Sequence, residues 1–362
     1  MYSFSCLALI ILICVCLFIT YYYYYSQAKE SMTSEPFSAS ASVSASTPVP
    51  TVWIYAYHPV RNHNKNMSRF SDIFCGFQRL ALASTCVHLE KTNPIRFIHK
   101  NNIRKLCPRI PCDFHKIDPF LLEHYCKYQM LSKYGGFWIS PNTLVFKNIN
   151  TIFQAELQKY RNKSKNSLST APYMPFAMIS GTQLESSAYE NLLIPDDACI
   201  LCEPNNPIIT HIASVLEKYI SEFPNHPDYS FNQDASKMLY YFIQPSVSMR
   251  DSESVYLANT GLHGLTDPKG NHLTMEMCMS EYTVCRPSDH IAWFSFDSYY
   301  KDRIFVTQKY GWFTNLSEDQ IVDSKMWISR LYREALQFEK GSSTVLVYGQ
   351  TNPAQVIWEN QL

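Results

Sequence analysis

The sequence predicts an α/β domain with a mostly parallel sheet flanked by helices, preceded by a transmembrane helix and a flexible stem. Three observations lead to this fold class. Apolar runs of strand length alternate with helical patterns from Thr51 to Phe146, which is typical of a parallel sheet. An uncharged apolar segment lies near the N-terminus, and a Ser/Ala/Thr/Pro tract follows it. With 46% hydrophobic residues over 362 positions, the chain can form a sizeable core.

Residues 1–25 are predicted to form a transmembrane signal anchor. Cys6 to Thr20 are apolar and uncharged, and the tyrosines Tyr21 to Tyr25 would lie at the lipid headgroups. A cleaved signal peptide is the alternative, because Ser26-Gln27-Ala28 could serve as its cleavage site. We favour a retained anchor because of the tyrosines and because no basic n-region precedes the apolar segment.

Residues 26–50 are predicted to be a flexible stem, and residues 51–362 the folded body. The stem is a Ser/Ala/Pro-rich tract with few side chains that could pack. The chain contains 31 Lys and Arg and 31 Asp and Glu, so its overall charge favours no polyanion. We therefore expect no nucleic-acid partner.

One further feature agrees with a lumenal body, in which disulfides could also form. N-glycosylation sequons begin at Asn66, Asn162 and Asn315. Nine cysteines follow the apolar segment, and some could form disulfides, although their spacing alone does not assign the pairs.

In the first half of the body, local patterns predict strands and helices in alternation. The expected elements are a strand at Thr51–Tyr57, a helix at Ser68–Cys86, a strand at Ile95–His99 and a short helix at Asn101–Leu106. A longer helix should follow through Lys133, with Asp118 as N-cap, Pro119 in its first turn and Gly135-Gly136 at its end. Phe137–Ile139 and Leu144–Phe146 should then be short strands around Pro141.

The second half has a less regular pattern. We expect a basic loop at Tyr160–Thr170 and a C-terminal helix at Ser317–Phe338, with Ser317 as N-cap. Further strands are predicted at 174–180, 198–202, 255–259, 291–296 and 303–307, and helices at 207–223 and 232–242.

The segment from Glu123 to Asn142 carries a family resemblance. Glu123-His-Tyr-Cys-Lys127 is followed by Leu131-Ser-Lys-Tyr-Gly-Gly-Phe-Trp-Ile-Ser-Pro-Asn142. It resembles the core of the DxD sugar-binding and capsular-polysaccharide-type glycosyltransferases, in which a helix with Asp-x-x-Arg runs into Tyr-Gly-Gly, an aromatic-aliphatic pair and the acidic DxD motif. The anchor and stem are similar to those of type II membrane glycosyltransferases.

The resemblance implies a GT-A-like (Rossmann-like) fold that binds a nucleotide-sugar donor at its strand ends. It also implies a single-pass type II membrane protein and, if the protein is eukaryotic or viral, a body on the lumenal side of the endoplasmic reticulum or Golgi. The acceptor would be a glycan, a protein or a lipid. In such enzymes the DxD acids hold Mn²⁺ or Mg²⁺, which offsets the charge of the donor diphosphate.

Carried over position by position, the resemblance assigns donor contacts to the following residues: Tyr55, His124, Lys127, Gly135, Gly136, Trp138, Ser140 and Asn142. His124 and Lys127 replace the helix Asp and Arg, while Ser140 and Asn142 replace the two DxD acids. Asn142 is thus a weak metal candidate, because its amide oxygen is a neutral dipole where the family has a carboxylate. Lys127, His124 or a helix N-terminus could instead stabilise the diphosphate without metal.

Asp234 is the remaining acidic candidate. It follows Phe231-Asn-Gln and precedes a helical pattern, which resembles an acidic helix start beside the donor sugar in several GT-A enzymes. We expect Asp234 to orient the acceptor or to bind metal as a catalytic residue. The alternative is an Asp that only interacts with the dipole of its helix. Trp312 is a candidate aromatic platform for the acceptor sugar.

The sequence therefore predicts a membrane-anchored glycosyltransferase that uses a nucleotide sugar and whose metal site is weakened by the loss of the two DxD acids. The replaced acids leave two alternatives open: a catalytically inactive GT-A-like protein that binds a glycan or protein partner at a membrane, and a structural envelope or membrane protein. No nucleophile elbow, P-loop, zinc-protease motif or dinucleotide fingerprint favours another enzyme class.

Overall fold

A computed structural model describes most of the predicted body. The described residues are 49–57, 69–111, 113–166, 174–183, 193–222, 255–258, 262, 264, 269, 273–281, 291–296, 309–337 and 352–361. They belong to one compact unit, Val49–Leu362. Within them, no helix has both the length and the apolar character that a membrane span requires. The predicted anchor, Asp234, the helix at 232–242 and the strand at 303–307 lie outside the described residues.

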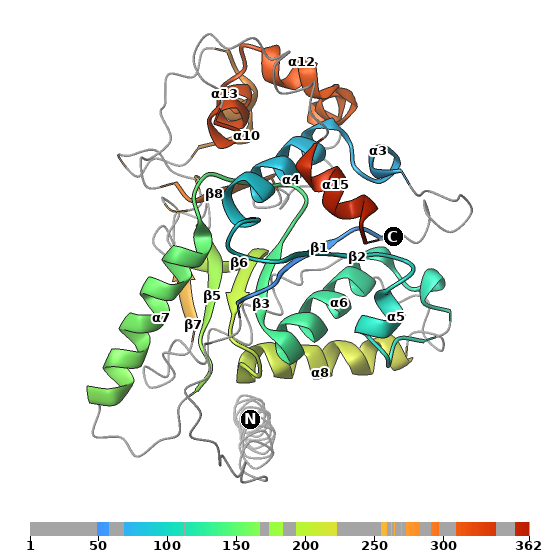
Figure 1. The fold of residues 1–362 in the computed structure, drawn as a ribbon, viewed down its shortest axis with the longest axis vertical. Coiled ribbons are helices and arrows are strands. Elements are labelled where there is room, and N and C mark those ends of the chain that lie inside the picture. The colour runs from blue at the N-terminus through green and yellow to red at the C-terminus, as the bar shows by residue number, and fades with distance from the viewer. Residues whose placement is uncertain are drawn as a thin grey trace, which may run out of the picture. The chain divides into compact units, whose positions relative to one another are not determined.

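The central element is a six-stranded sheet, which confirms the predicted α/β architecture (Figure 1). Its order is β2-β1-β3-β6-β5-β7. The strands, in chain order, are β1 (Val52–Tyr55), β2 (Ile95–Ile98), β3 (Gly136–Ile139), β5 (Ala177–Gln183), β6 (Leu193–Cys202) and β7 (Val255–Ala258). The pairs β1–β2, β1–β3 and β5–β7 are parallel, whereas β6 runs antiparallel to both β3 and β5. The sheet is thus mostly parallel, with one strand inserted in the opposite direction.

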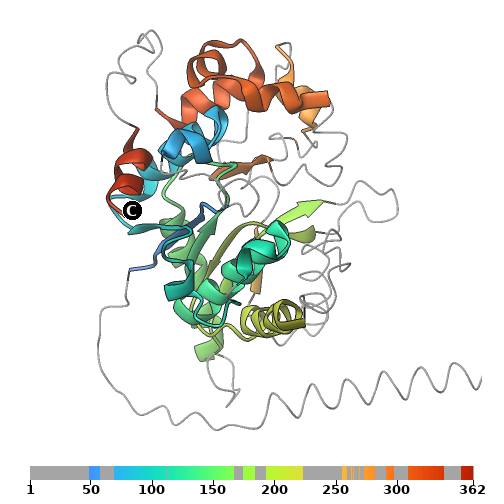
Figure 2. The same ribbon diagram turned by 90° about the vertical axis from the view of Figure 1, so that its right-hand side faces the viewer.

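Helices cover both faces of this sheet (Figures 1 and 2). Helices α6 (Pro119–Tyr134) and α8 (Pro207–Glu222) share a core with Trp53 and Tyr55 of β1. Helices α4 (Gly76–Leu89), α7 (Ile149–Asn166) and α15 (Pro353–Glu359) share a second core with Val52 and Ile54. Alternate residues of β1 therefore enter opposite cores, as the two-residue repeat of a strand requires.

A third core lies around a two-stranded sheet of β4 (Thr143–Val145) and β8 (Trp293–Ser295). The helices that contribute to it include α10 (Met275–Met279), η4 (Gly311–Asn315), α12 (Glu318–Asp323) and α13 (Trp327–Ala335). The single helix predicted for Ser317–Phe338 is wrong, because extended backbone at Ser324 divides it. Arg333 compensates by donating to the carbonyl oxygens of Val322 and Ser324. Ser317 does cap α12, as expected.

Two other predictions need correction. The helix expected at Ser68–Cys86 is divided into α3 (Phe70–Ile73) and α4, with Cys75 as the N-cap of α4. The loop expected from Tyr160 is helical as far as Asn166, the end of α7. Lys and Arg are good helix formers, and tertiary contacts anchor this part of the helix. Tyr160 stacks on Phe176 at 5.2 Å, and Arg161 pairs with Glu203 at 2.7 Å.

Strand β2 forms one edge of the sheet, and the C-terminal segment covers this edge. The Gln361 side chain accepts from the N–H of Phe97 at 2.9 Å and donates to the carbonyl oxygen of Ile95 at 2.8 Å. Trp358 packs edge-on against Phe97, with ring centroids 5.4 Å apart. One side-chain amide thus replaces a neighbouring strand at an edge that would otherwise offer unpaired backbone groups.

A buried cluster of charge at the carboxyl end of β3

The order of the strands reverses at β1, and this position defines the candidate site. The chain passes from β1 through α4 to β2, and then through α6 to β3 on the other side of β1. The two crossovers lie on opposite faces of the sheet. In open α/β sheets, ligands bind at the carboxyl ends of the strands where such a reversal occurs. The relevant ends are those of β1 and β3.

Helix α6 carries two of the predicted site residues to this position. Its N-cap, Asp118, accepts from the N–H groups of Phe120 and Leu121. His124 and Lys127 lie three positions apart in this helix and therefore share one face. The predicted start and end of the helix are both confirmed, with Gly135 as C-cap at a positive φ of 61°, which glycine adopts readily.

The centre of the cluster is Asp197, a residue of β6. Its Oδ2 lies 2.7 Å from Nε2 of His124 and 2.8 Å from Nζ of Lys127. The same ammonium also donates to the carbonyl oxygen of Asp197 at 3.2 Å. The side chains of Lys127, His124 and Asp197 are only 4%, 12% and 16% exposed, so solvent screens these charges weakly.

The register of the sheet places Asp197 at the carboxyl end of β3. Ile139 pairs with Cys199 in the antiparallel ladder, and the N–H of Ser140 donates to the carbonyl oxygen of Ala198 at 3.0 Å. Asp197 is the next residue, so it lies beside the turn that begins at Ser140. Asp197, which lies 70 positions from Lys127 in the sequence, thereby joins His124 and Lys127 beside the turn that begins at Ser140.

The charges of this cluster determine the protonation state of Asp197. Burial by itself raises the pKa of this carboxyl group. Lys127 first and His124 second outweigh that effect by charge and by hydrogen bonding, and they hold the pKa of Asp197 well below its ordinary range. The carboxylate is therefore ionised at neutral pH, and Lys127 is its buried counterion.

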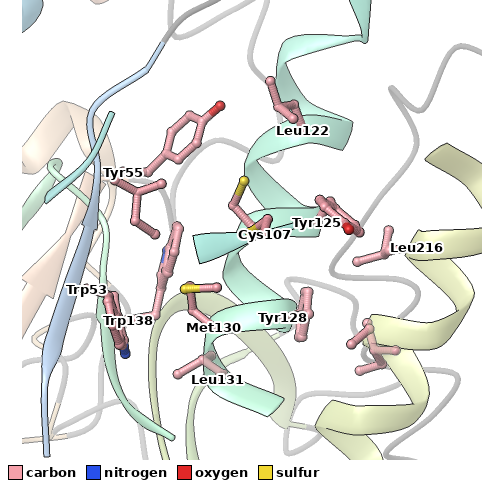
Figure 3. Close-up of a cluster of buried hydrophobic side chains, with 14 of the residues drawn as sticks. Trp53, Tyr55, Cys107, Leu122, Tyr125, Tyr128, Met130, Leu131, Trp138 and Leu216 are labelled. Atoms are coloured by element: carbon pink, nitrogen blue, oxygen red, sulfur yellow. The ribbon is translucent and has the colours of Figure 1, made fainter. Parts of the chain in front are cut away.

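Aromatic side chains from β1 and β3, among them Tyr55 and Trp138, pack in the core that contains α6 (Figure 3). Nζ of Lys127 lies 5.4 Å from the centroid of the Trp138 ring, within the range of a cation–π interaction. Tyr55 lies beside Trp138, with ring centroids 6.3 Å apart. The hydroxyls of Tyr55 and Tyr57 and Nε1 of Trp138 are buried without a hydrogen-bond partner among the described residues. Such groups cost free energy unless a water or ligand satisfies them.

Ser140 and Asn142 form a turn between β3 and β4. The N–H of Thr143 donates to the carbonyl oxygen of Ser140 at 3.0 Å, which closes a β-turn with Pro141 at its second position. The hydroxyl of Ser140 accepts from the N–H of Asn142 at 3.2 Å. The Asn142 Oδ1 accepts from Nε2 of Gln78 at 2.8 Å. The side-chain oxygens of both residues therefore have hydrogen-bond donors within the fold.

The described residues at this turn do not fit a Mn²⁺ or Mg²⁺ site. Within the described part of the chain, no group of three or more His, Cys, Asp or Glu side chains could hold a metal ion. Asp197 is the carboxylate beside the turn, and its oxygen already contacts the Lys127 ammonium. Two unit charges 4 Å apart interact by about 4 kcal/mol at a dielectric constant of 20. The ammonium of Lys127 therefore offsets most of the attraction that Asp197 would have for a divalent ion.

Gly135 and Gly136 lie at the amino end of β3, away from the other predicted donor residues. Gly136 is three residues from the end of the strand, a separation of about 10 Å. Its φ is +99°, and a Cβ atom there would lie 2.3 Å from the carbonyl oxygen of Thr51. A Cβ atom on Gly135 would lie 2.6 Å from the backbone nitrogen of Pro204. Close backbone packing thus accounts for both glycines.

The structure brings together Tyr55, His124, Lys127, Trp138 and Ser140, with Asn142 in the adjoining turn. Asp234 lies outside the described residues. Trp312, on η4, has 47% of its surface exposed, as an aromatic platform requires. Asp197 was not predicted. The available signal was the acidic pair Asp196-Asp197 immediately before a buried apolar strand, where a charged residue needs a partner.

Comparison with known proteins found no protein-family model and no curated protein that matches this chain.

Proposed function

We propose that this protein is a membrane-anchored glycosyltransferase of GT-A-like fold that moves a sugar from a nucleotide-sugar donor to a glycan, protein or lipid acceptor. One observation carries the proposal. Residues that the family resemblance assigns to the donor, among them Tyr55, His124, Lys127 and Trp138, meet at the carboxyl ends of β1 and β3. That is the position at which open α/β sheets bind nucleotides.

Each of these groups has a chemical role in the proposed reaction. As the glycosidic bond of the donor breaks, negative charge develops on the leaving diphosphate, and Lys127 and His124 would stabilise it. The buried hydroxyl of Tyr55 and Nε1 of Trp138 would donate hydrogen bonds to the donor. By resemblance, transfer would retain the anomeric configuration, and Asp234 would act on the acceptor side.

The membrane anchor is part of the same proposal. It rests on the apolar segment Cys6 to Thr20 and the five tyrosines after it. Its test is extraction of the full chain from membranes at alkaline pH. Retention in the membrane pellet is expected, whereas release of a shortened chain would favour a cleaved signal peptide.

Isothermal titration of residues 49–362 with UDP, GDP and their sugars tests the donor site. These residues form one compact unit, so they are a suitable fragment. Saturable binding of a nucleotide sugar is expected, and its hydrolysis or transfer should then be measured with glycan, peptide and lipid acceptors. Absence of binding to every donor would contradict the proposal.

A catalytically inactive GT-A-like protein is the second candidate. It is favoured by the hydrogen bonds that Ser140 and Asn142 make within their own turn, and by the pairing of Lys127 with Asp197. A cluster that only stabilises the fold would make the same contacts. Binding of a glycan or protein partner without turnover of any donor would favour this candidate, and donor turnover would exclude it.

A further inference from the structure

We infer that Lys127 takes the place of a divalent metal as the cation that faces the donor diphosphate, and that Asp197 and His124 hold it there. The inference rests on the proposed function and deepens it, because it makes donor binding independent of metal. Lys127 is a donor-contacting residue in this account, whereas Asp197 acts through Lys127 and is a positioning residue.

The charge balance of the cluster supports this assignment. A Mg²⁺ or Mn²⁺ site needs an excess of oxygen ligands with negative charge. Here the single negative charge of Asp197 is balanced by the ammonium of Lys127 at 2.8 Å, and His124 contacts the same carboxylate oxygen at 2.7 Å. The three side chains together are neutral, or positive when the imidazole is protonated. Such a cluster has no excess of negative charge with which to hold a divalent cation.

The position of the ammonium is well defined. Nζ of Lys127 is hydrogen-bonded to both the carboxylate and the carbonyl oxygen of Asp197, and it lies over the ring of Trp138. A lysine on the surface would lose side-chain entropy when it binds phosphate, but this one is already ordered. A cation fixed before the ligand arrives is the arrangement that electrostatic stabilisation of a leaving group requires.

The solvent exposure of the three side chains limits how a diphosphate could approach them. Lys127 is nearly closed to solvent, whereas His124 and Asp197 keep 12% and 16% of their side-chain surface exposed. The buried Tyr55 hydroxyl and Trp138 Nε1, which have no hydrogen-bond partner in the part of the chain that the structure describes, belong to the same core as the helix of Lys127. A diphosphate would reach Lys127 past the partly exposed side chains of His124 and Asp197, with these donors available for the rest of the nucleotide sugar.

The test is isothermal titration of the full chain with UDP, GDP and inorganic pyrophosphate, each in buffer with Mn²⁺ and in buffer with EDTA. We expect binding with affinities that agree within about twofold between the two buffers. Binding that needs Mn²⁺ would overturn the inference and leave the proposed function intact. Binding of none of the three ligands in either buffer would overturn both.

Variants then test the role of Lys127. Lys127→Met should weaken binding in EDTA by about a hundredfold, while Lys127→Arg, which keeps the charge, should retain a large part of it. Lys133→Met is the matched control, because Lys133 is an exposed lysine of the same helix and should bind as the wild type does. Thermal unfolding of each variant shows whether it is still folded. If Lys127→Met is not folded, the affinity of Lys127→Arg tests the role of Lys127 instead. Unchanged affinity of folded Lys127→Met would overturn the assignment.

Discussion

The Asp197 carboxylate lies 2.8 Å from the ammonium of Lys127, although 70 positions separate the two residues in the chain. This contact joins helix α6 to strand β6 across the carboxyl end of β3. It is a buried ion pair that a third group, His124, also contacts. Both the stability of the fold and the character of the candidate site depend on it.

Loss of one member of this pair should destabilise the fold. Asp197→Ala is expected to lower the free energy of unfolding by about 3 kcal/mol, because it leaves Lys127 charged, buried and unpaired. Urea denaturation measures the change. In the double variant Asp197→Ala with Lys127→Met, much of the loss should be recovered, since no buried charge remains. The exposed pair of Asp113 and Lys116 provides the control, and Asp113→Ala should have no measurable effect.

The same carboxylate predicts a dependence of stability on pH. The pKa of Asp197 is lower in the folded chain than its unfolded value of about 3.9, so ionised Asp197 stabilises the fold above that value. The stabilisation should be lost as pH falls below about 4, where the unfolded chain binds the proton first. Urea denaturation between about pH 5 and 3 should show a steeper decline for the wild type than for Asp197→Asn. Parallel declines would contradict the depressed pKa.

Substitution of Tyr55 distinguishes a structural role of its hydroxyl from a role in ligand binding. It is buried without a partner among the described residues, and burial raises its pKa well above the ordinary value. Tyr55→Phe removes this group and should leave the fold equally stable or more stable by about 1 kcal/mol. Affinity for UDP or GDP should nevertheless fall if the hydroxyl donates to the donor. A destabilised variant with unchanged nucleotide affinity would point instead to a structural partner, such as a buried water.

Gly136 should tolerate no side chain. Its φ of +99° disfavours other residues, and an added Cβ atom would meet the Thr51 carbonyl oxygen at 2.3 Å. Gly136→Ala is therefore expected to cost about 3 kcal/mol or more, measured by thermal or urea unfolding. Gly311→Ala is the control, because no atom lies within 4 Å of the position of its Cβ atom. If both variants have similar stability, the close contact at Gly136 is wrong.

Gln361, near the C-terminus, should protect the edge of the sheet at β2. Gln361→Ala removes the partner of the Phe97 N–H and of the Ile95 carbonyl oxygen, and should cost about 1 to 2 kcal/mol. Hydrogen exchange at the Phe97 amide should accelerate. Gln355→Ala changes a glutamine of the same segment whose side chain bonds Glu359 within α15, and it should leave that amide protected. Equal exchange in the two variants would contradict a specific role of Gln361.

Local sequence determined the elements whose signals act between neighbouring residues. The Asp118 cap with Pro119, the C-cap at Gly135 and the capping box at Ser317 were all predictable, because each satisfies backbone groups within one turn of itself. The apolar run that became β1 was predictable for a similar reason, since a strand buried on both faces needs apolar side chains at every position.

Tertiary contacts decided what local patterns could not. The helical state of Tyr160 to Asn166 depends on Phe176 and Glu203, which lie beyond the segment itself. The division of the predicted C-terminal helix depends on carbonyl groups that Arg333 satisfies. In the first case tertiary contacts reinforce a helix propensity that Lys and Arg already favour, and in the second a propensity of a few tenths of a kcal/mol per residue yields to packing and hydrogen bonds worth more.

For the candidate site, the residue types on α6 and in the Ser140 turn can be read from the sequence, whereas which of them act together depends on how the strands pair. Asp197 joins His124 and Lys127 only because β6 enters the sheet antiparallel to β3 and brings its acidic start to that strand's carboxyl end. Strand order and direction are set by the burial of whole strands against two helical layers, a long-range property that no local pattern of charge contains.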